Sequence, residues 1–227
     1  MVRKNVEFNL KAKAGNQESD EVSANSDLPI NESIIDVDGN LYSTVQIGTQ
    51  YWMAENLKAM HYNNGDEIEL RSTDNTQWFL AGGGAFCYYN NDQIFEQYYG
   101  KIYNWYAVTD SRKICPSGWQ IPSDSDFNEL IAFLGGSGVA GDKLKLSGNE
   151  YWAISVGSNE YGFSAMPGGY RATDGNFDGL NHAAYFWSSK IDNQSNSAFY
   201  LALTEAPYAY LYSSSPNFGC SVRCLKN

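Results

Sequence analysis

Residues 122–136 have the features of an amphipathic α-helix and read Pro-Ser-Asp-Ser-Asp-Phe-Asn-Glu-Leu-Ile-Ala-Phe-Leu-Gly-Gly. Ser123 is the expected N-cap, and Asp126 lies three residues further on, near the positive end of the helix. Gly135-Gly136 is expected to end the helix, because glycine readily adopts the left-handed conformation found at helix ends. The apolar residues recur at helical spacing and form one stripe, which comprises Phe127, Leu130, Ile131 and Leu134.

A second helix is expected earlier in the chain, over Tyr99–Val108, although this stretch is ambiguous between helix and strand. Ile102, Trp105 and Tyr106 recur at helical spacing, and Tyr99 precedes them by one turn. After Gly136 no stretch has a helical period, so two main helices are predicted.

Strand-like segments lie on both sides of these helices. Ile34–Gly48 reads as a hairpin, because the Asp-Gly and Gly-Asn pairs of Asp36-Val37-Asp38-Gly39-Asn40 favour tight turns. These residues resemble the first half of a calcium loop, but no glutamate follows at the twelfth position, so a plain turn is expected. The pattern predicts an α+β fold with a mixed or antiparallel sheet, long irregular loops and paired terminal strands. The later strands are expected at Ala184–Ser189, Ala198–Leu203, Tyr208–Tyr212 and Ser221–Leu225.

The composition argues against several classes of function. The 227 residues include 26 acidic and 15 basic side chains, a formal charge of −11. A surface this acidic repels the phosphates of nucleic acids, so no nucleic-acid partner is expected. Only two histidines, His61 and His182, are present, which leaves metal-hydrolase and histidine-triad chemistry short of residues. No apolar run approaches the roughly 18 residues of a membrane helix, so no transmembrane segment is expected.

The chain is expected to divide near Ser33. Val6, Phe8 and Leu10 alternate with polar residues in a run too short and too polar for a secretion signal. Residues 14–32 lack an apolar period, which is typical of a solvated linker. We therefore expect a strand-like segment and polar linker over residues 1–33 and a folded domain over residues 34–227. With 17 tyrosines and 21 glycines, the composition is typical of an extracellular or cell-surface protein, whose signal or anchor is expected to be absent from this chain.

Six motifs follow one another in a characteristic order along this domain. The first runs from Asp38 to Leu57, and the others are Tyr99-Gly100-Lys101-Ile102-Tyr103-Asn104-Trp105, Cys115-Pro116-Ser117-Gly118-Trp119-Gln120-Ile121-Pro122, Gly162-Phe163-Ser164-Ala165-Met166-Pro167-Gly168-Gly169-Tyr170-Arg171, Trp187-Ser188-Ser189 and Ser221-Val222-Arg223-Cys224. In this order they resemble the Fibrobacter succinogenes major paralogous domain, a family common in secreted and surface proteins of Bacteroidetes. The resemblance covers about Ile35 to Lys226.

The resemblance implies a C-type-lectin-like fold, related to formylglycine-generating enzymes and to the variable proteins of diversity-generating retroelements. It implies no catalytic activity. It does not imply sugar binding through calcium either, because the Glu-Pro-Asn, Gln-Pro-Asp and Trp-Asn-Asp triplets of calcium-dependent lectins are absent. The chain departs from the family at Cys220, where an aromatic residue usually precedes Ser-Val-Arg-Cys.

Four cysteines, Cys87, Cys115, Cys220 and Cys224, allow three complete pairings, and disulfides fit an extracellular module. The resemblance implies a bridge between Cys115 and Cys224. Cys87 and Cys220 are then expected to form the second pair, and two free buried thiols are the alternative.

Catalysis is not expected, because the acidic residues lie mostly in turns or in the linker and no acid–base pair stands out. His182 follows Asn181 in a glycine-rich loop, where a solvated histidine is more typical than a general base. Cys220 and Cys224 would share one face of an extended strand, as the two copper-binding thiolates of a formylglycine-type oxidase require. Cys224 is better explained as a structural half-cystine, so this enzyme is the less favoured alternative. No cofactor and no metal site are predicted.

A ligand-binding surface is the preferred interpretation. Between Asn181 and Phe218 aromatic residues alternate with small polar ones, which is the chemistry of adaptable recognition surfaces. Tyr208, Tyr210 and Tyr212 would share one face of a strand. The alternative is that half of the aromatic rings in this region belong to the hydrophobic core. In lectin-like folds, as the resemblance implies, this region faces the ligand. The predicted ligand-binding residues are His182, Tyr185, Asn193, Tyr208, Tyr210, Tyr212 and Asn217.

The predicted partner is a glycan or a surface protein, bound without catalysis. One alternative is a structural or assembly protein of the cell surface or of a phage particle, in which the tyrosine face is buried against a neighbouring subunit. A retroelement-diversified binding protein, variable over residues 181–218, also fits the resemblance. The sequence does not define the oligomeric state.

Overall fold

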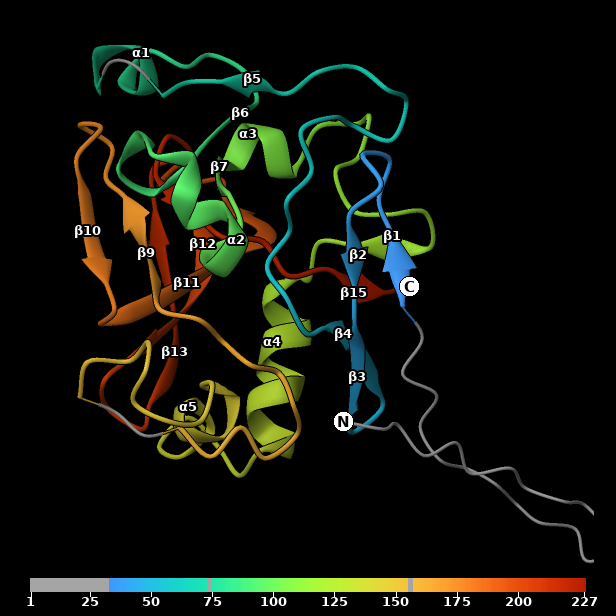
Figure 1. The fold of residues 1–227 in the computed structure, drawn as a ribbon, viewed down its shortest axis with the longest axis vertical. Helices are drawn as coiled ribbons and strands as arrows, with labels where there is room; N and C mark the ends of the chain where they lie inside the picture. Colours follow the sequence, from blue (N-terminus) through green and yellow to red (C-terminus); the bar gives the residue numbers. More distant parts are fainter. Residues whose placement is uncertain (1–32, 73–74, 155–156) are drawn as a thin grey trace, which may run out of the picture. The chain divides into compact units, whose positions relative to one another are not determined.

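The computed structural model describes residues 33–72, 75–154 and 157–227 (Figure 1). The predicted N-terminal segment and linker lie, apart from Ser33, outside the described residues. The α+β class is confirmed, since most of the regular structure is strand and the helices are few.

Among the described residues, only one helix is longer than five residues. The helical segments are α1 (Asn75–Phe79), η1 (Tyr89–Asn91), η2 (Gln93–Phe95), α2 (Glu96–Tyr99), α3 (Trp105–Val108), α4 (Asp124–Phe133) and α5 (Ala140–Leu144). The first strands are β1 (Ile34–Ile35), β2 (Leu41–Tyr42), β3 (Thr44–Ile47), β4 (Gln50–Met53), β5 (Glu69–Leu70), β6 (Ala85–Cys87), β7 (Ile102–Asn104) and β8 (Trp119–Gln120). The later strands are β9 (Gly168–Arg171), β10 (Phe177–Leu180), β11 (Ala183–Asp192), β12 (Ser197–Thr204), β13 (Ala209–Ser214), β14 (Gly219–Cys220) and β15 (Leu225–Lys226).

The main sheet has nine strands in the order β13-β12-β11-β9-β14-β7-β6-β5, with β10 added on β9. It is mixed, because β11 runs parallel to β9 and β5 parallel to β6, while the other pairs are antiparallel. A smaller sheet has the order β3-β4-β15-β8. Leu225 of β15 pairs with Trp52 of β4, so the predicted pairing of the opening and closing strands is confirmed.

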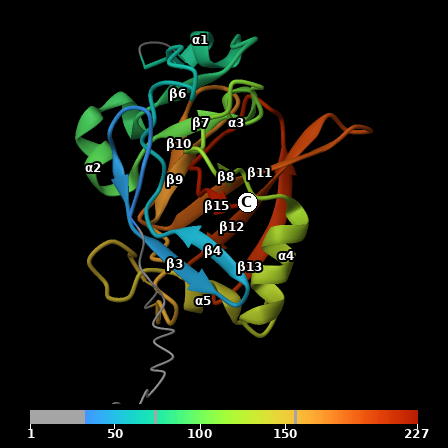
Figure 2. The ribbon, with the colours of Figure 1, turned by 90° about the vertical axis from the view of Figure 1, so that its right-hand side faces the viewer.

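Helix α4 matches its prediction closely. Ser123 and Asp126 form a reciprocal capping box: the Ser123 hydroxyl accepts from the Asp126 N–H, and the Asp126 carboxylate accepts from the Ser123 N–H. The predicted apolar stripe faces the core, where the Phe127 ring stacks on Trp52 with centroids 5.5 Å apart. In Figure 2 the helix lies beside β13, and the same core holds Leu201 and Leu203 of β12.

The second predicted helix is wrong. Tyr99–Val108 contains the end of α2, strand β7 and the short helix α3. Gly100, at φ 69°, ends α2, and β7 then pairs with both β6 and β14 inside the main sheet. The Asn104 side chain accepts from the Ala107 N–H and starts α3. The apolar residues recur at helical spacing, but no continuous helix forms, because β7 pairs within the sheet and the chain breaks at Gly100 and Asn104.

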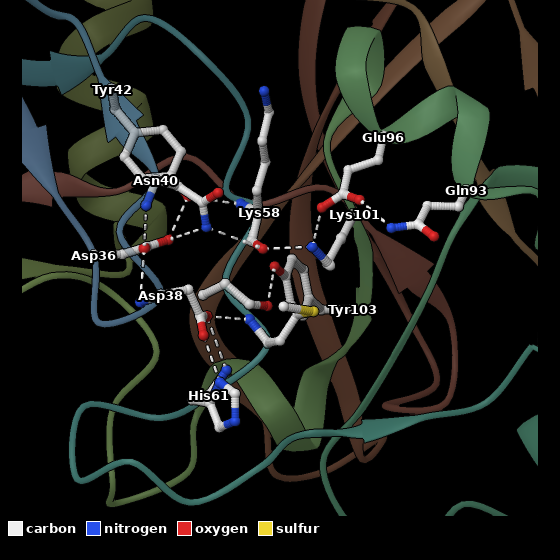
Figure 3. Close-up of polar contacts among 12 residues, drawn as sticks. Asp36, Asp38, Asn40, Tyr42, Lys58, His61, Gln93, Glu96, Lys101 and Tyr103 are labelled. Carbon is white, nitrogen blue, oxygen red and sulfur yellow. Dashed lines mark hydrogen bonds and ion pairs between the residues drawn. The ribbon is translucent and has the colours of Figure 1, made fainter.

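Buried polar groups fasten the opening hairpin to the domain (Figure 3). The Asp36 carboxylate accepts from the backbone N–H groups of Asp38 and Asn40 and, at 2.6 Å, from the Tyr42 hydroxyl. That hydroxyl also accepts from the Lys58 N–H at 2.9 Å. The predicted turn at Asp36–Asn40 is therefore confirmed, and its carboxylate is occupied by the protein's own donors.

The same network contains a buried lysine. Lys101, 1% exposed, pairs through Nζ with Glu96 and donates to the backbone oxygen of Lys58 at 2.5 Å. Its Nζ also lies 5.4 Å from the centroid of the Phe86 ring. Burial lowers the pKa of Lys101, and Glu96 opposes that shift. Lys101 is thus a structural group, fully engaged by the protein.

Asp38→Asn is expected to reduce the free energy of unfolding by about 1 kcal/mol at pH 7, because hydrogen bonds to a charged acceptor become neutral ones. Burial alone would raise the pKa of Asp38, but hydrogen bonds from Met60 and His61 hold that pKa below its ordinary value. A lowered pKa stabilises the fold above the unfolded-state pKa, and this stability is lost as the pH falls through the folded-state value.

Urea unfolding of the wild type and the Asp38→Asn variant, measured between pH 7 and pH 3, checks this expectation. The difference between the two proteins should be full at pH 7 and should shrink below about pH 4. A constant difference over the whole range would contradict the role given to the Asp38 charge.

Candidate functional site

Strands β11, β12 and β13 place alternate side chains on opposite faces of the main sheet. On one face Leu211 of β13, Leu201 of β12 and Phe186 of β11 form a row, which packs in the core with α4. On the other face the register aligns two mainly aromatic rows, Tyr212–Tyr200–Trp187 and Tyr210–Ala202–Tyr185. One sheet face therefore packs in the core with α4. On the opposite face Trp187 is buried in a second core cluster, Tyr185 and Tyr200 are partly buried against it, and Tyr210 and Tyr212 are exposed.

The predicted tyrosine ladder is exposed. Tyr208, Tyr210 and Tyr212 keep 45%, 41% and 53% of their surface accessible, while Ala209 between them is fully buried. Neighbouring rings lie 5.6 Å and 6.3 Å apart, so the three form one continuous strip along β13. Within the described part of the chain, none of the three hydroxyls has a hydrogen-bond partner.

Phe218, which the sequence analysis did not select, is the centre of the adjoining aromatic cluster. Its ring stacks on Tyr170 at 4.9 Å and on Tyr200 at 5.4 Å, and it meets the Tyr185 ring edge-on. Tyr200 in turn contacts Tyr212, which joins this cluster to the exposed strip. We call Tyr170, Tyr185, Tyr200, Tyr208, Tyr210, Tyr212 and Phe218 the tyrosine surface. The signal for Phe218 was available, because it belongs to the aromatic–polar alternation that ends there.

A shallow, open depression of about 450 Å³ adjoins the tyrosine surface. Tyr170, Tyr185 and His182 line it together with Asp178 and Glu205. His182 pairs through Nδ1 with Glu205, and the Tyr170 hydroxyl lies 3.4 Å from the Asp178 carboxylate. Two predicted residues, His182 and Tyr185, thus lie at one site that combines ring faces with carboxylate acceptors.

The hydroxyls of Tyr185, which lines this depression, and of Tyr200 in the adjoining aromatic cluster are protonated at neutral pH. Burial, followed by the neighbouring Tyr170, raises the pKa of Tyr185 to about 12. Burial also raises the pKa of Tyr200. Among the described residues neither hydroxyl has a protein hydrogen-bond partner, so both are free to donate to a ligand and to accept from one.

Two predicted ligand-binding residues lie elsewhere. Asn193 is in the turn between β11 and β12, at the opposite end of the hairpin from His182; at about 3.3 Å per residue, this is more than 20 Å away. Figure 2 shows that hairpin extending outward. Asn217 lies beside Phe218, but its side-chain amide donates to the Phe79 backbone oxygen at 2.5 Å. Asn217 thus holds the loop in place.

Of the two predicted disulfides, one is confirmed and the other is wrong. Cys115 and Cys224 form a disulfide that joins residues 109 positions apart. Cys87 and Cys220 are free and buried, so the predicted second bridge is wrong. They sit on β6 and β14, which flank β7 on opposite sides, and two strand spacings of about 4.8 Å are too far for a disulfide. Because Cys224 is in a disulfide, it does not form a thiolate pair with Cys220.

Thiol titration is expected to count two free cysteines per chain, and only after unfolding. Burial raises the pKa of Cys220 and raises that of Cys87 to about 12, so neither supplies a reactive thiolate near neutral pH. A coloured thiol reagent, added to native protein and to protein in denaturant, checks both numbers. Rapid native labelling, or no labelling in denaturant, would contradict this assignment.

Across residues 33–72, 75–154 and 157–227, no helix has the length and apolar character needed to cross a bilayer. The same ranges contain no group of three or more His, Cys, Asp or Glu side chains placed to hold a metal ion.

A family model described as the Fibrobacter succinogenes major domain matches residues 45–226. Neither the curated proteins nor the solved structures gave a significant match. The C-type-lectin-like fold therefore stays a prediction.

Proposed function

The chain belongs to the Fibrobacter succinogenes major domain family, and from this premise we propose that it is a non-catalytic binding module of C-type-lectin-like fold. Its tyrosine surface recognises a glycan or a protein partner outside the cell or on its surface. A retroelement-diversified variable protein would use the same face. The observation that carries the proposal is the exposed ladder of Tyr208, Tyr210 and Tyr212 on a rigid sheet.

The physical chemistry of this surface suits recognition. Tyrosine offers a large contact area at a low cost in side-chain entropy, and its hydroxyl gives a polar contact at the edge of the ring. The ladder is held by β12, whose opposite side chains are core, so little ordering is needed when a ligand binds. The depression beside Tyr185 adds the carboxylates of Asp178 and Glu205, which accept hydrogen bonds from hydroxyl or amide groups.

The test is a glycan and surface-protein binding screen with the wild type and the triple variant Tyr208→Ala, Tyr210→Ala, Tyr212→Ala. The triple variant should bind any selected ligand at least about 100-fold more weakly, as expected for removal of a central aromatic hot spot. Tyr51→Ala is the matched control, because Tyr51 is an exposed tyrosine of β4 in the smaller sheet. Equal binding by the triple variant would refute the proposal.

Assembly is the second candidate function, and the free edge of β13 favours it. The Ala209 N–H donates to Ser137 at 2.9 Å, so Ala209, Leu211 and Ser213 turn their backbone groups away from β12. In the described part of the chain, these backbone N–H and C=O groups of Leu211 and Ser213 have no hydrogen-bond partner. The strand carries no charged side chain, whereas protected edges usually have one.

A second copy fits this edge in a register that uses the free backbone groups. An antiparallel, two-fold pair centred on Tyr212 places Leu211 opposite Ser213 of the second copy, which uses the free backbone groups and leaves the Ala209–Ser137 bond intact. Tyr212→Cys should then cross-link to itself under mild oxidation, because opposed residues of a non-hydrogen-bonded pair lie about 4.5 Å apart. Tyr210→Cys is the control and should not cross-link. No cross-linking, or equal cross-linking of both variants, would exclude this assembly.

A further inference from the structure

A second depression, also of about 450 Å³, lies where separate sequence motifs meet. Ala54, Glu55 and Asn56 come from the first motif, Gly100 from the second, and Ser164 and Met166 from the fourth. It shares no lining residue with the depression beside Tyr185.

A buried positive charge lies next to this depression. Arg223, 0% exposed, donates to the Asn56 side-chain oxygen at 2.7 Å and to the Ser164 backbone oxygen at 3.0 Å, and both of these residues line the depression. Within the described residues Arg223 forms no ion pair. Burial lowers the pKa of Arg223, and Glu55 is the charge that opposes this shift.

A second positive charge lines the wall itself. The Lys58 backbone is bound within the network of the opening hairpin, but Figure 3 shows its side chain running away from that network. Among the described residues Nζ of Lys58 has no hydrogen-bond or ion-pair partner. Glu55 is the one carboxylate of the lining, and it accepts from the Ser43 N–H at 2.8 Å. Lys58 and the buried Arg223 therefore face two carboxylates here, because Glu150 interacts with the lining residue Tyr151 and Glu55 is itself part of the lining; the unpaired ammonium of Lys58 is the cation open to a ligand.

Two tyrosine rings and a glutamine amide also line this depression. Tyr98 is half exposed, and its ring lies 6.0 Å from that of Tyr151. Gln97 beside it is exposed, and its side-chain amide has no partner within the described chain. Flat ring faces next to an amide, a carboxylate and an ammonium group suit a polyhydroxylated ring that carries a negative charge.

We propose that this depression binds a carboxylated sugar, a hexuronate unit of an acidic polysaccharide. Lys58 takes the carboxylate, and the buried charge of Arg223 adds attraction from below. Tyr98 and Tyr151 contact the apolar face of the sugar ring, while Gln97 and the free oxygen of Glu55 bind its hydroxyls. This site shares no residue with the tyrosine surface, so each of the two proposals can be refuted without the other.

Calorimetric titration with trigalacturonate and with its methyl ester tests the proposal, because the two probes differ in charge and little in shape. The acid should bind at least 10-fold more tightly than the ester. Lys58→Gln should abolish that preference, and Tyr98→Ala should weaken both ligands. Higher salt should weaken the acid alone.

The controls are Lys190→Gln, which removes an exposed lysine of β11, and the triple alanine variant of the tyrosine ladder. Both should leave binding of trigalacturonate unchanged. Equal affinity for acid and ester, no binding of either, or a preference that survives Lys58→Gln would overturn the proposal. Loss of binding in the triple variant with Lys58→Gln unaffected would also overturn it, because the sugar would then sit on the tyrosine surface.

Discussion

Removing the Cys115–Cys224 disulfide is expected to lower the free energy of unfolding by about 5 kcal/mol. The bridge joins residues 109 positions apart and so closes a very long loop. When the bridge is removed, the unfolded chain gains the conformational entropy that this closed loop had restricted. It also ties the end of the chain to the segment that precedes α4. A domain of this size has a total stability of about 5–15 kcal/mol, so the loss is a large fraction of the whole.

Urea unfolding of the double variant Cys115→Ala, Cys224→Ala, compared with the wild type, measures this loss. Reductant should destabilise the wild type by a similar amount and should leave the double variant unchanged, since Cys87 and Cys220 are already thiols. A double variant within about 1 kcal/mol of the wild type would show that the bridge adds little stability.

Arg223→Ala is expected to cost on the order of 4 kcal/mol, because it leaves several buried oxygen acceptors without a donor. The guanidinium binds the backbone oxygens of Met53 and of the adjacent residues Phe163 and Ser164, so it joins two chain segments far apart in the sequence. It also lies 4.6 Å from the centroid of the Phe163 ring. Arg223 therefore joins β4, the loop before β9 and the final segment of the chain.

Thermal and urea unfolding of Arg223→Ala, Arg223→Lys and Arg112→Ala check this expectation. Arg223→Lys should recover part of the loss, because it keeps the charge but lacks the planar fork that reaches several acceptors at once. Arg112, paired with Asp66 and Asp110 at the surface, is the matched control and should change stability little. Equal effects of Arg223→Ala and Arg112→Ala would contradict the role assigned to the buried guanidinium.

Local signals in the sequence predicted the elements they govern. Helix α4 was predicted because its cap, stripe and glycine stop lie within fifteen residues and agree with one another. Strands β11, β12 and β13 were predicted in the stretch where aromatic residues are interspersed with small polar ones. Along β13, the alternation of tyrosines with Ala209 and Leu211 also defines which face carries Tyr208, Tyr210 and Tyr212. The Cys115–Cys224 bridge came from the family resemblance.

Features that depend on distant contacts were not predicted. The helical period of Tyr99–Val108 gives no sign that β6 and β14 will pair with β7. The closing segment was expected to be one strand over Ser221–Leu225, whereas β14 ends at Cys220 and β15 starts at Leu225. Cys87 and Cys220 were paired by elimination, although β7 lies between their strands. The depression lined by Lys58 brings together several distant segments, and no local pattern marks it.

Covalent footprinting of tyrosines, with and without a ligand selected in the binding screen, tests whether the tyrosine ladder of β13 is the binding surface. Tyr208, Tyr210 and Tyr212 should be labelled rapidly in the free protein at low and high concentration, and they should be strongly protected when the ligand is bound. Buried Tyr103 should stay unlabelled throughout. If these three tyrosines are already protected in the free protein at high concentration, or are labelled equally when the ligand is bound, the ladder is not a ligand-binding surface.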